Sequence, residues 1–238
     1  MRLKLISCEV LYREICDAVA SAPHTVDVEF LPKGLHDLGS AKMRAELQRR
    51  IDGVDASAYS AVLLGYALCG NGLDGLVARQ LPLVAPRAHD CIALLMGSRR
   101  RYQEYFDAHP GVCYRSAGWL ERGPAIEQLA QELVRKYGEE NGRYLFDELN
   151  RYQRAYNQLV FIETGLEPDD RFEEQARQEA RERGWRFEKL RGSLRLFRAL
   201  LAGDWDREDF LVVEPGWRIV ARYDDAIIHA EPAGQANA

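Results

Sequence analysis

The sequence predicts an α/β protein with a mainly parallel sheet flanked by helices. Two patterns lead to this fold class: short apolar runs of strand length recur along the chain, and most are followed by segments with apolar residues at helical spacing. With 238 residues, 47% of them hydrophobic, the chain is long enough to bury such a core. We expect residues 1–238 to form a single domain, with a metal- and ligand-site lobe over residues 1–110 and a lid and smaller C-terminal lobe over residues 111–238.

The first four elements alternate strand and helix. An apolar run opens the chain, the segment VDVEFL alternates with the period of a strand, and Met43, Leu47 and Ile51 recur at spacings of four. These patterns predict, in order, a strand at Leu3–Ser7, a helix at 11–19, a strand at Val26–Leu31 and a helix at Lys42–Ile51.

The central stretch carries two further strands. Val62–Leu64 is an apolar run that ends in Gly65, as a strand buried on both faces does. A glycine-rich turn follows, and apolar residues at helical spacing predict a helix over residues 73–77. A second short strand, Leu81–Ala85, stops at Pro86.

The second half repeats the alternation with more helix. The segment Val112–Glu121 is irregular, and we expect it to be a loop that forms a lid over the site. The other segments predict helices at Arg99–Phe106, Ala125–Tyr137, Glu139–Tyr156, Arg171–Arg183 and Leu194–Leu201, and strands at Leu159–Ile162, Trp185–Leu190, Phe210–Val213 and Ile219–Tyr223.

Charge and hydropathy exclude several classes of function. The formal net charge of -5 and the absence of a long Lys and Arg run argue against nucleic acid as a partner. The beginning of the chain has no long apolar segment typical of a signal peptide, and no apolar run is long enough to span a bilayer, so we expect no membrane association and a cytoplasmic location. In that reducing compartment the five cysteines are expected to be thiols or ligands rather than disulfides.

Cysteines follow three of the predicted strands. Cys8 ends the first strand, Cys69 follows the strand at Val62–Leu64, and His89 and Cys91 follow the next one. Carboxyl ends of parallel strands open onto one crevice, so we expect these side chains to meet there. Thiolate and imidazole are the ligands that zinc prefers, and thiolates also hold iron–sulfur clusters. The pattern favours a metal ion, Zn²⁺ first, or an iron–sulfur cluster; the alternative is that the thiols pack under the sheet.

Three further side chains are candidates for catalysis. Asp90 is placed to orient His89 or to act as a base, although an aspartate in a turn commonly binds its own backbone. Arg87 presents a fork suited to a carboxylate or phosphate of a small-molecule substrate, or to a surface acid. His36 lies after Gly34 and is expected to form another polar arm of the crevice or to cap a helix.

The glycine-rich turn offers backbone groups to a ligand. Gly70, Asn71 and Gly72 permit close approach of a cofactor or metal to the main chain. The segment GNGLDG fits the dinucleotide spacing literally, but Asp74 stands where a phosphate would be repelled. A nucleotide-binding regulator is a third hypothesis for the function, and it requires no metal.

Several segments together resemble the domain of unknown function 1638 family over nearly the whole chain. The segments are LISCEVLYREI, FLPKGLHD, LQRRID, LLGYALCGNGLDGL, LPLVAPRAHDCIALLMGSRRRYQEYF, GWLERG, LVFIETGL and GDWDREDFLVVEPG. The positions that match the family pattern are Cys8, His36, Cys69, Gly70, Gly72, His89, Asp90 and Cys91. The resemblance implies an association with corrinoid proteins and their methyltransferases, and so with one-carbon metabolism, but no reaction.

Two functions of different classes follow. The first is a metal-dependent protein whose Cys and His site acts on a small molecule, with thiol or methyl transfer as the favoured chemistry, which would make it a transferase. The second is a non-enzymatic accessory protein that binds a metallocofactor and delivers it to a partner methyltransferase. An open coordination position favours the enzyme, and a saturated metal beside an apolar docking patch favours the accessory role.

Overall fold

The chain forms two compact units in a computed structural model that describes residues 1–123, 126–149, 151 and 155–234, without the side chains of residues 36, 37 and 126–129. The first unit contains residues 1–103 and 192–238, and the second contains residues 104–191. The division falls within helix α4 (Arg99–Ala108). No helix in the described ranges is both long and apolar enough to cross a membrane.

A five-stranded sheet with the order β2-β1-β3-β4-β8 forms the centre of the first unit. All of its pairings are parallel except that between β4 and β8, which is antiparallel. Because β1 lies between β2 and β3, the chain reverses its direction across the sheet at the β1/β3 pair, where ligand crevices form in sheets of this kind. The strands are β1 (Arg2–Cys8), β2 (Thr25–Leu31), β3 (Ala61–Gly65), β4 (Leu83–Pro86) and β8 (Phe210–Val213).

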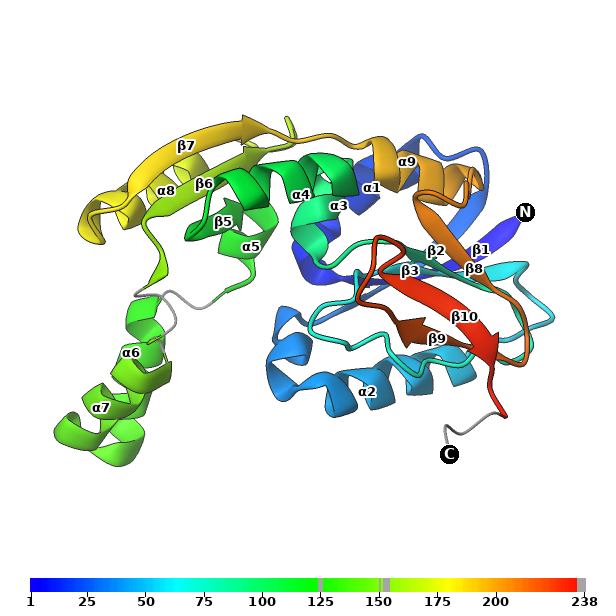
Figure 1. Cartoon of the computed structure of the whole chain (residues 1–238), viewed down its shortest axis with the longest axis horizontal. Helices are drawn as coiled ribbons and strands as arrows, with labels where there is room; N and C mark the ends of the chain where they lie inside the picture. Colours follow the sequence, from blue (N-terminus) through cyan, green and yellow to red (C-terminus); the bar gives the residue numbers. More distant parts are fainter. Residues whose placement is uncertain (124–125, 150, 152–154, 235–238) are drawn as a thin grey trace. The chain divides into compact units, whose positions relative to one another are not determined.

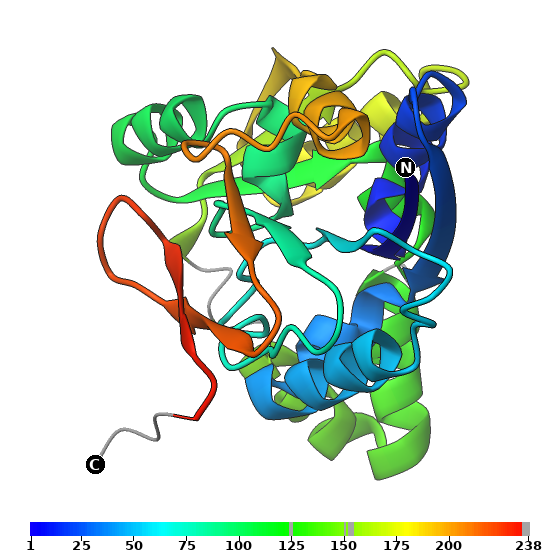
Figure 2. The same ribbon diagram turned by 90° about the vertical axis from the view of Figure 1, so that its right-hand side faces the viewer.

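Helices cover both faces of this sheet. α2 (Ser40–Asp52) lies on one side, and α1 (Tyr12–Ala20) and α9 (Arg195–Ala202) lie together on the other (Figure 1), an arrangement that the view turned by 90° repeats (Figure 2). The antiparallel pair β9 (Trp217–Ala221) and β10 (Ile228–Pro232) shares the α2 side through a common apolar core. Shorter helices complete the unit: η1 (Glu9–Leu11), η2 (Lys33–Leu38) and α3 (Cys91–Met96).

The spacing of apolar residues in α2 explains its packing. Met43, Leu47 and Ile51 repeat every four residues, lie on one face of the helix, and are at most 5% exposed in the core shared with β1 and β3. Burial of a side chain of this size contributes about 1.5–3 kcal/mol. Arg49 lies on the opposite face, Arg50 lies beside the apolar face, and both pair with Glu46.

The second unit is built on the parallel sheet β5-β6-β7. Its apolar core comes from β6, from α5 and from α8, with Phe161 and Ala176 fully or nearly fully buried. α6 and α7 form a hairpin in which Gly142 approaches the backbone of Val134, and an added Cβ at Gly142 would lie 2.5 Å from the Val134 Cα. The elements are β5 (Val112–Ser116), α5 (Ala117–Glu121), α6 (Ile126–Tyr137), α7 (Glu139–Leu149), β6 (Gln158–Glu163), α8 (Arg171–Glu182) and β7 (Arg186–Arg191).

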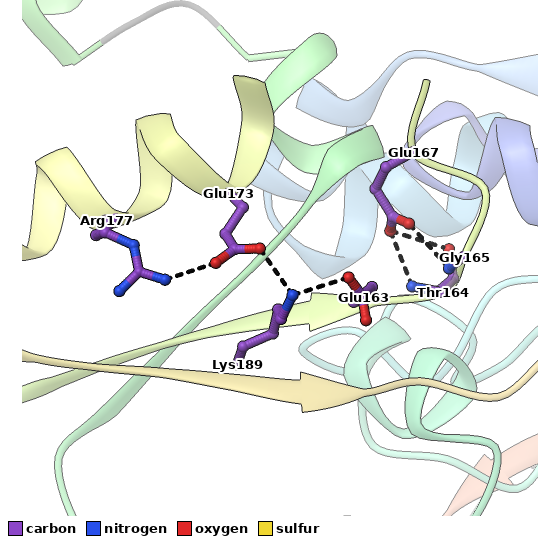
Figure 3. A network of polar contacts seen from close by, with 7 residues as sticks. All are labelled: Glu163, Thr164, Gly165, Glu167, Glu173, Arg177 and Lys189. Carbon is purple, nitrogen blue, oxygen red and sulfur yellow. Dashed lines mark hydrogen bonds and ion pairs between the residues drawn. The ribbon is translucent and has the colours of Figure 1, made fainter. Parts of the chain in front are cut away.

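Ion pairs fasten α8 to this sheet. Lys189 on β7 donates to Glu163 on β6 and to Glu173 on α8, and Glu173 also accepts from Arg177 (Figure 3). Beyond β6, the Glu167 carboxylate accepts hydrogen bonds from the Thr164 and Gly165 backbone amides (Figure 3). The first set of contacts joins α8 to β6 and β7, and the second holds the turn after β6.

The structure confirms the α/β class with a mainly parallel sheet and differs from the sequence predictions in local elements. Residues 112–116 form a strand and 117–121 a helix, not a loop, because parallel pairing with β6 supplies the order that the residue pattern does not reveal. The helix expected over 73–77 is absent: the amide of Gly75 and the carbonyl of Leu76 bond instead to Ile219 of β9.

Other elements were shorter than expected or were not anticipated. α7 is described over Glu139–Leu149 and Tyr156 is not helical, while residues 150 and 152–154 of the expected helix lie outside the described part of the chain. α3 was missed because its six residues, CIALLM, are almost uniformly apolar and give no helical periodicity. β10 was missed as well.

Candidate functional site

Strand order brings two of the predicted cysteines to the β1/β3 switch point. Ser7 pairs with Gly65 in the parallel register, so Cys8 and Tyr66 leave adjacent strand ends. The segment after β3 then runs beside the segment after β4, because the amides of Leu68 and Cys69 donate to the carbonyls of Ala88 and His89, both at 2.9 Å. The three segments that carry Cys8, Cys69 and Cys91 therefore share the carboxyl edge of the sheet.

The turn after β3 has an unusual backbone. Cys69, Gly70 and Asn71 all have positive φ, at 43°, 64° and 69°. A left-handed conformation costs a residue with a side chain roughly 1–2 kcal/mol, and such strain gathers at functional sites. The Gly70 position faces open space, since an added Cβ would meet nothing within 4 Å. Gly72, in contrast, packs on the core: its added Cβ would lie 2.2 Å from the Met43 sulfur.

The environment of the three thiols keeps them protonated. Burial raises the pKa of Cys69 to about 12, with smaller contributions from the charges of Asp90 and Cys8. Burial also raises the pKa of Cys91 well above its ordinary value, and the charges of Cys69, Asp90 and Cys8 raise it further. The pKa of Cys8 is raised mainly by burial. Negative charge on Cys8 thus opposes ionisation of Cys69, and negative charge on either of them opposes ionisation of Cys91.

A tyrosine hydroxyl is buried beside them. Tyr66 is 4% exposed, and its hydroxyl has no hydrogen-bond partner among the described residues. Burial raises the pKa of Tyr66, and the charges of Cys8 and Cys69 raise it further. The sequence prediction did not include Tyr66, although its place directly after the apolar run that ends in Gly65 was an available signal.

The structure gives the other predicted residues different surroundings. His89 is exposed, and its charge acts on Asp90. Asp90 caps α3 by accepting from the amides of Ile92 and Ala93, and its second oxygen accepts from Tyr102 at 2.8 Å. Burial raises the pKa of Asp90.

Arg87 binds main-chain carbonyls. Its Nε donates to Phe210 at 3.2 Å, and its Nη1 donates to Ala226 and Ile228. These bonds tie the end of β4 to β8 and to the start of β10. Burial lowers the pKa of Arg87, and the charge of Arg99 lowers it further.

Two further residues singled out in the sequence are His36 and Asp74. His36 lies in η2, but its side chain is outside the described part of the structure, so its predicted role stays a prediction. Asp74 of the GNGLDG segment accepts from the Ala221 amide at 2.9 Å, and its carbonyl accepts from Arg44. The acid in this motif therefore joins the turn to β9 and α2.

Thiol sulfurs are ligands suited to a soft cation, but in this structure the three cysteine side chains do not converge on one position. All five cysteines are free, and Cys8, Cys69 and Cys91 are partly exposed. Within the described residues, no three His, Cys, Asp or Glu side chains are arranged to hold one metal ion as they stand. Rotation about each cysteine Cα–Cβ bond moves the sulfur without moving the backbone.

Comparison with known proteins identifies a family for this chain but no activity. None of the curated proteins matches the chain. A solved thioesterase domain from the curacin biosynthetic pathway aligns with a TM-score of 0.20 and 11% identity, over 85% of this chain and 88% of that chain, a likeness too low to carry an argument. The sequence model described as a protein of unknown function, DUF1638, matches residues 30–201, which include Cys69, His89 and Cys91 and exceed half of the chain. The chain belongs to the DUF1638 family.

Proposed function

We propose that the crevice at the carboxyl ends of β1, β3 and β4 binds a soft metal, zinc first or an iron–sulfur cluster, through the thiolates of Cys8, Cys69 and Cys91. The observation that carries this proposal is the placement of the three cysteine-bearing segments at one edge of the sheet, where Ser7 pairs with Gly65 and the Cys69 amide donates to the His89 carbonyl. A cysteine binds a metal as the thiolate, and a cation among the three sulfurs would offset the cost of burying that negative charge.

Three thiolates leave a fourth coordination position on a tetrahedral ion. His89 is the predicted fourth ligand, and its exposed side chain would have to turn inward to reach the sulfurs. If it does not, a small molecule could take the fourth position, and the Gly70 position in the adjacent turn has no neighbour within 4 Å of an added Cβ. A bound metal would supply Lewis-acid chemistry and keep a sulfur nucleophile ionised at neutral pH.

Within this proposal the protein acts on a small molecule by thiol or methyl transfer in the reducing cytoplasm. Family resemblance suggests the partner, a corrinoid protein or its methyltransferase. The chain's own residues would hold the metal, with the left-handed turn at 69–71 shaping the backbone, and the apolar core against which Cys8 and Cys69 pack would limit water on that side. An accessory protein that delivers a metallocofactor would use the same ligands but fill every coordination position.

Elemental analysis and a visible spectrum test the proposal on protein purified without oxygen and without an affinity tag. We expect about one zinc per chain without colour, or iron with acid-labile sulfide and a brown spectrum. Protein that takes up neither zinc nor iron, even after reconstitution, would show that the thiols are packing or redox groups and would end the proposal.

Serine variants locate the ligands. We expect Cys8→Ser, Cys69→Ser and Cys91→Ser each to lower metal retention strongly. Cys16→Ser is the matched control, because Cys16 is exposed on α1. Equal retention in all four variants, or equal loss, would contradict the ligand assignment. Binding of an added thiol to the cobalt-substituted protein then separates an open coordination position from a filled one.

A further inference from the structure

A cavity with charged walls lies in the first unit, and none of its lining residues is a predicted metal ligand. Its volume is about 330 Å³, at the lower end of the range of about 300–1,000 Å³ that small-molecule sites occupy. The first turn of α4, the first residue of α9 and the loop before β8 form its walls. The charged residues that line it are Arg99, Arg100, Arg195, Asp206, Glu208 and Asp209.

Close contacts fix the beginnings of α4 and α9 against each other. The Ser193 amide donates to the Leu95 carbonyl at 2.8 Å, and Arg195 Nε donates to the Gly97 carbonyl at 3.0 Å. Gly97 has a φ of 71°, and an added Cβ there would lie 2.5 Å from the Ser193 Cβ. Only a glycine permits this approach, so two walls of the cavity are built into the fold.

Part of the charge in the cavity is already paired. Arg195 Nη1 binds Asp209 Oδ2 at 2.5 Å, and this contact raises the pKa of Arg195. Asp206 accepts the amides of Glu208 and Asp209 at 2.9 Å through a single carboxylate oxygen, Oδ1. These bonds order the loop before β8, and the second oxygen of Asp206 is left to accept from another donor.

Arg99 and Glu208 line the cavity without forming an ion pair with any of the described residues. Arg99 is half-buried, and its Nη1 donates to the main-chain carbonyl of Asp225, which is a neutral acceptor. A guanidinium has five N–H donors, so most of those of Arg99 stay available. Glu208 is exposed on the facing loop. The cavity therefore offers a cation at one wall and a carboxylate at another.

The balance of charge identifies the chemistry of the occupant. Arginines and acids line the cavity in equal number, so an ion of one sign would meet attraction and repulsion together. A molecule that carries both charges gains at both ends, because charge-assisted hydrogen bonds are the strong ones. Among the described residues that line the cavity none is aromatic, so a primary ammonium, which donates N–H bonds, fits better than a quaternary one.

We propose that this cavity binds a small zwitterion of the amino-acid class, with its carboxylate on Arg99 and its primary ammonium between Glu208 and Asp206. The ligand breaks no existing ion pair, since Arg195 and Asp209 keep theirs. The site shares no residue with the proposed metal site, so either site can fail without the other.

Titration of the isotope-labelled full chain, followed by amide NMR signals, tests the proposal. The probes are glycine, 4-aminobutyrate and 6-aminohexanoate, which differ in the separation of their charges. Each is compared with the acid and the amine of the same chain length. At least one zwitterion should bind about tenfold more tightly than both of its singly charged analogues and should shift the amides of residues 98–100 and 206–209. A series in which no zwitterion exceeds its analogues would overturn the proposal.

Glu208→Gln removes the acceptor for the ammonium and should weaken binding of the zwitterion about tenfold. Glu214→Gln is the matched control, because Glu214 is also exposed but lies beyond the other end of β8. The Glu208 side chain has no contact to lose, so Glu208→Gln should keep the melting temperature of the parent protein. Equal affinities in Glu208→Gln and Glu214→Gln would contradict the assignment of the ammonium.

Arg99→Gln tests the other end of the ligand. It should also weaken binding about tenfold, whereas Arg207→Gln should not, since Arg207 is exposed beside Glu208 but is not among the described residues that line the cavity. Arg99→Gln also loses the bond to the Asp225 carbonyl, and its melting temperature shows whether the fold is kept. Unchanged affinity in both Arg99→Gln and Glu208→Gln would place the ligand elsewhere and overturn the proposal.

Discussion

Metal affinity should depend steeply on pH if Cys8, Cys69 and Cys91 are the ligands. The pKa of each thiol is raised, mainly by burial, and the pKa of Cys69 reaches about 12. All three are therefore protonated in the metal-free protein at neutral pH, and each must release its proton to bind. The logarithm of the binding constant should then rise by about three for each pH unit.

The magnitude is large enough to measure directly. Between about pH 6.5 and 7.5 the zinc affinity should increase on the order of 1,000-fold, equivalent to about 4 kcal/mol. Competition against a chelator of known affinity gives the binding constant at each pH, after correction for the chelator's own protons. Calorimetry in two buffers of different ionisation enthalpy counts the released protons independently.

A variant with one thiol fewer provides the control. Cys69→Ser should reduce the slope by about one, whereas Cys16→Ser should leave it at about three. A slope of one or less in the parent protein, with zinc bound, would refute the reasoning, because it would mean that at most one protonated thiol becomes a ligand.

Three further outcomes follow from packing and charge. Gly72→Ala should destabilise the protein by about 1–3 kcal/mol in denaturant unfolding, because the new Cβ would lie 2.2 Å from the Met43 sulfur. The same substitution should cost less in a Met43→Ala background, and an equal cost in both backgrounds would contradict the contact. The metal-free protein should lose stability as the pH rises from 9 toward about 12. The pKa of Cys69 in the folded protein lies above its ordinary value of 9.0, so the stabilisation present below pH 9 disappears as the thiol ionises. An equal alkaline loss in a Cys69→Ser variant would contradict this. Lys189→Met should lower the melting temperature at low salt, and lower it less in about 1 M salt, because Lys189 bridges Glu163 and Glu173. Arg143→Met, which breaks an exposed ion pair within α7, is the control. Equal melting temperatures for the two variants would show that the Lys189 bridge contributes nothing.

The sequence predicted those helices and strands in which the spacing of apolar residues corresponds to the face that is buried. α2 was predicted because its apolar residues fall on one face, and β3 because all five of its residues are buried. α3 and β5 were not predicted, since a fully apolar hexapeptide and a short mixed strand give no periodicity. The segment 73–77 was wrongly predicted as a helix, because Gly75 and Leu76 form backbone hydrogen bonds with Ile219 of β9, which is far along the chain.

For the candidate site, too, part could be predicted from the sequence and part could not. The sequence alone indicated that Cys8, Cys69 and Cys91 follow parallel strands, and such strand ends share one edge of a sheet. The surroundings of Arg87, Asp90 and Tyr66 depended on partners that are distant in sequence.

The sequence by itself determined the α/β class, the family and the placement of three cysteines at strand ends, because these depend on local pattern and motif. Only the tertiary structure decided that residues 192–238 join residues 1–103 in one unit, that Arg87 binds the carbonyls of Phe210 and Ala226, and that the Tyr66 hydroxyl is buried at the thiols. The physical reason is that burial and hydrogen-bond partners are set by the packing of segments far apart in the chain, which no local pattern records.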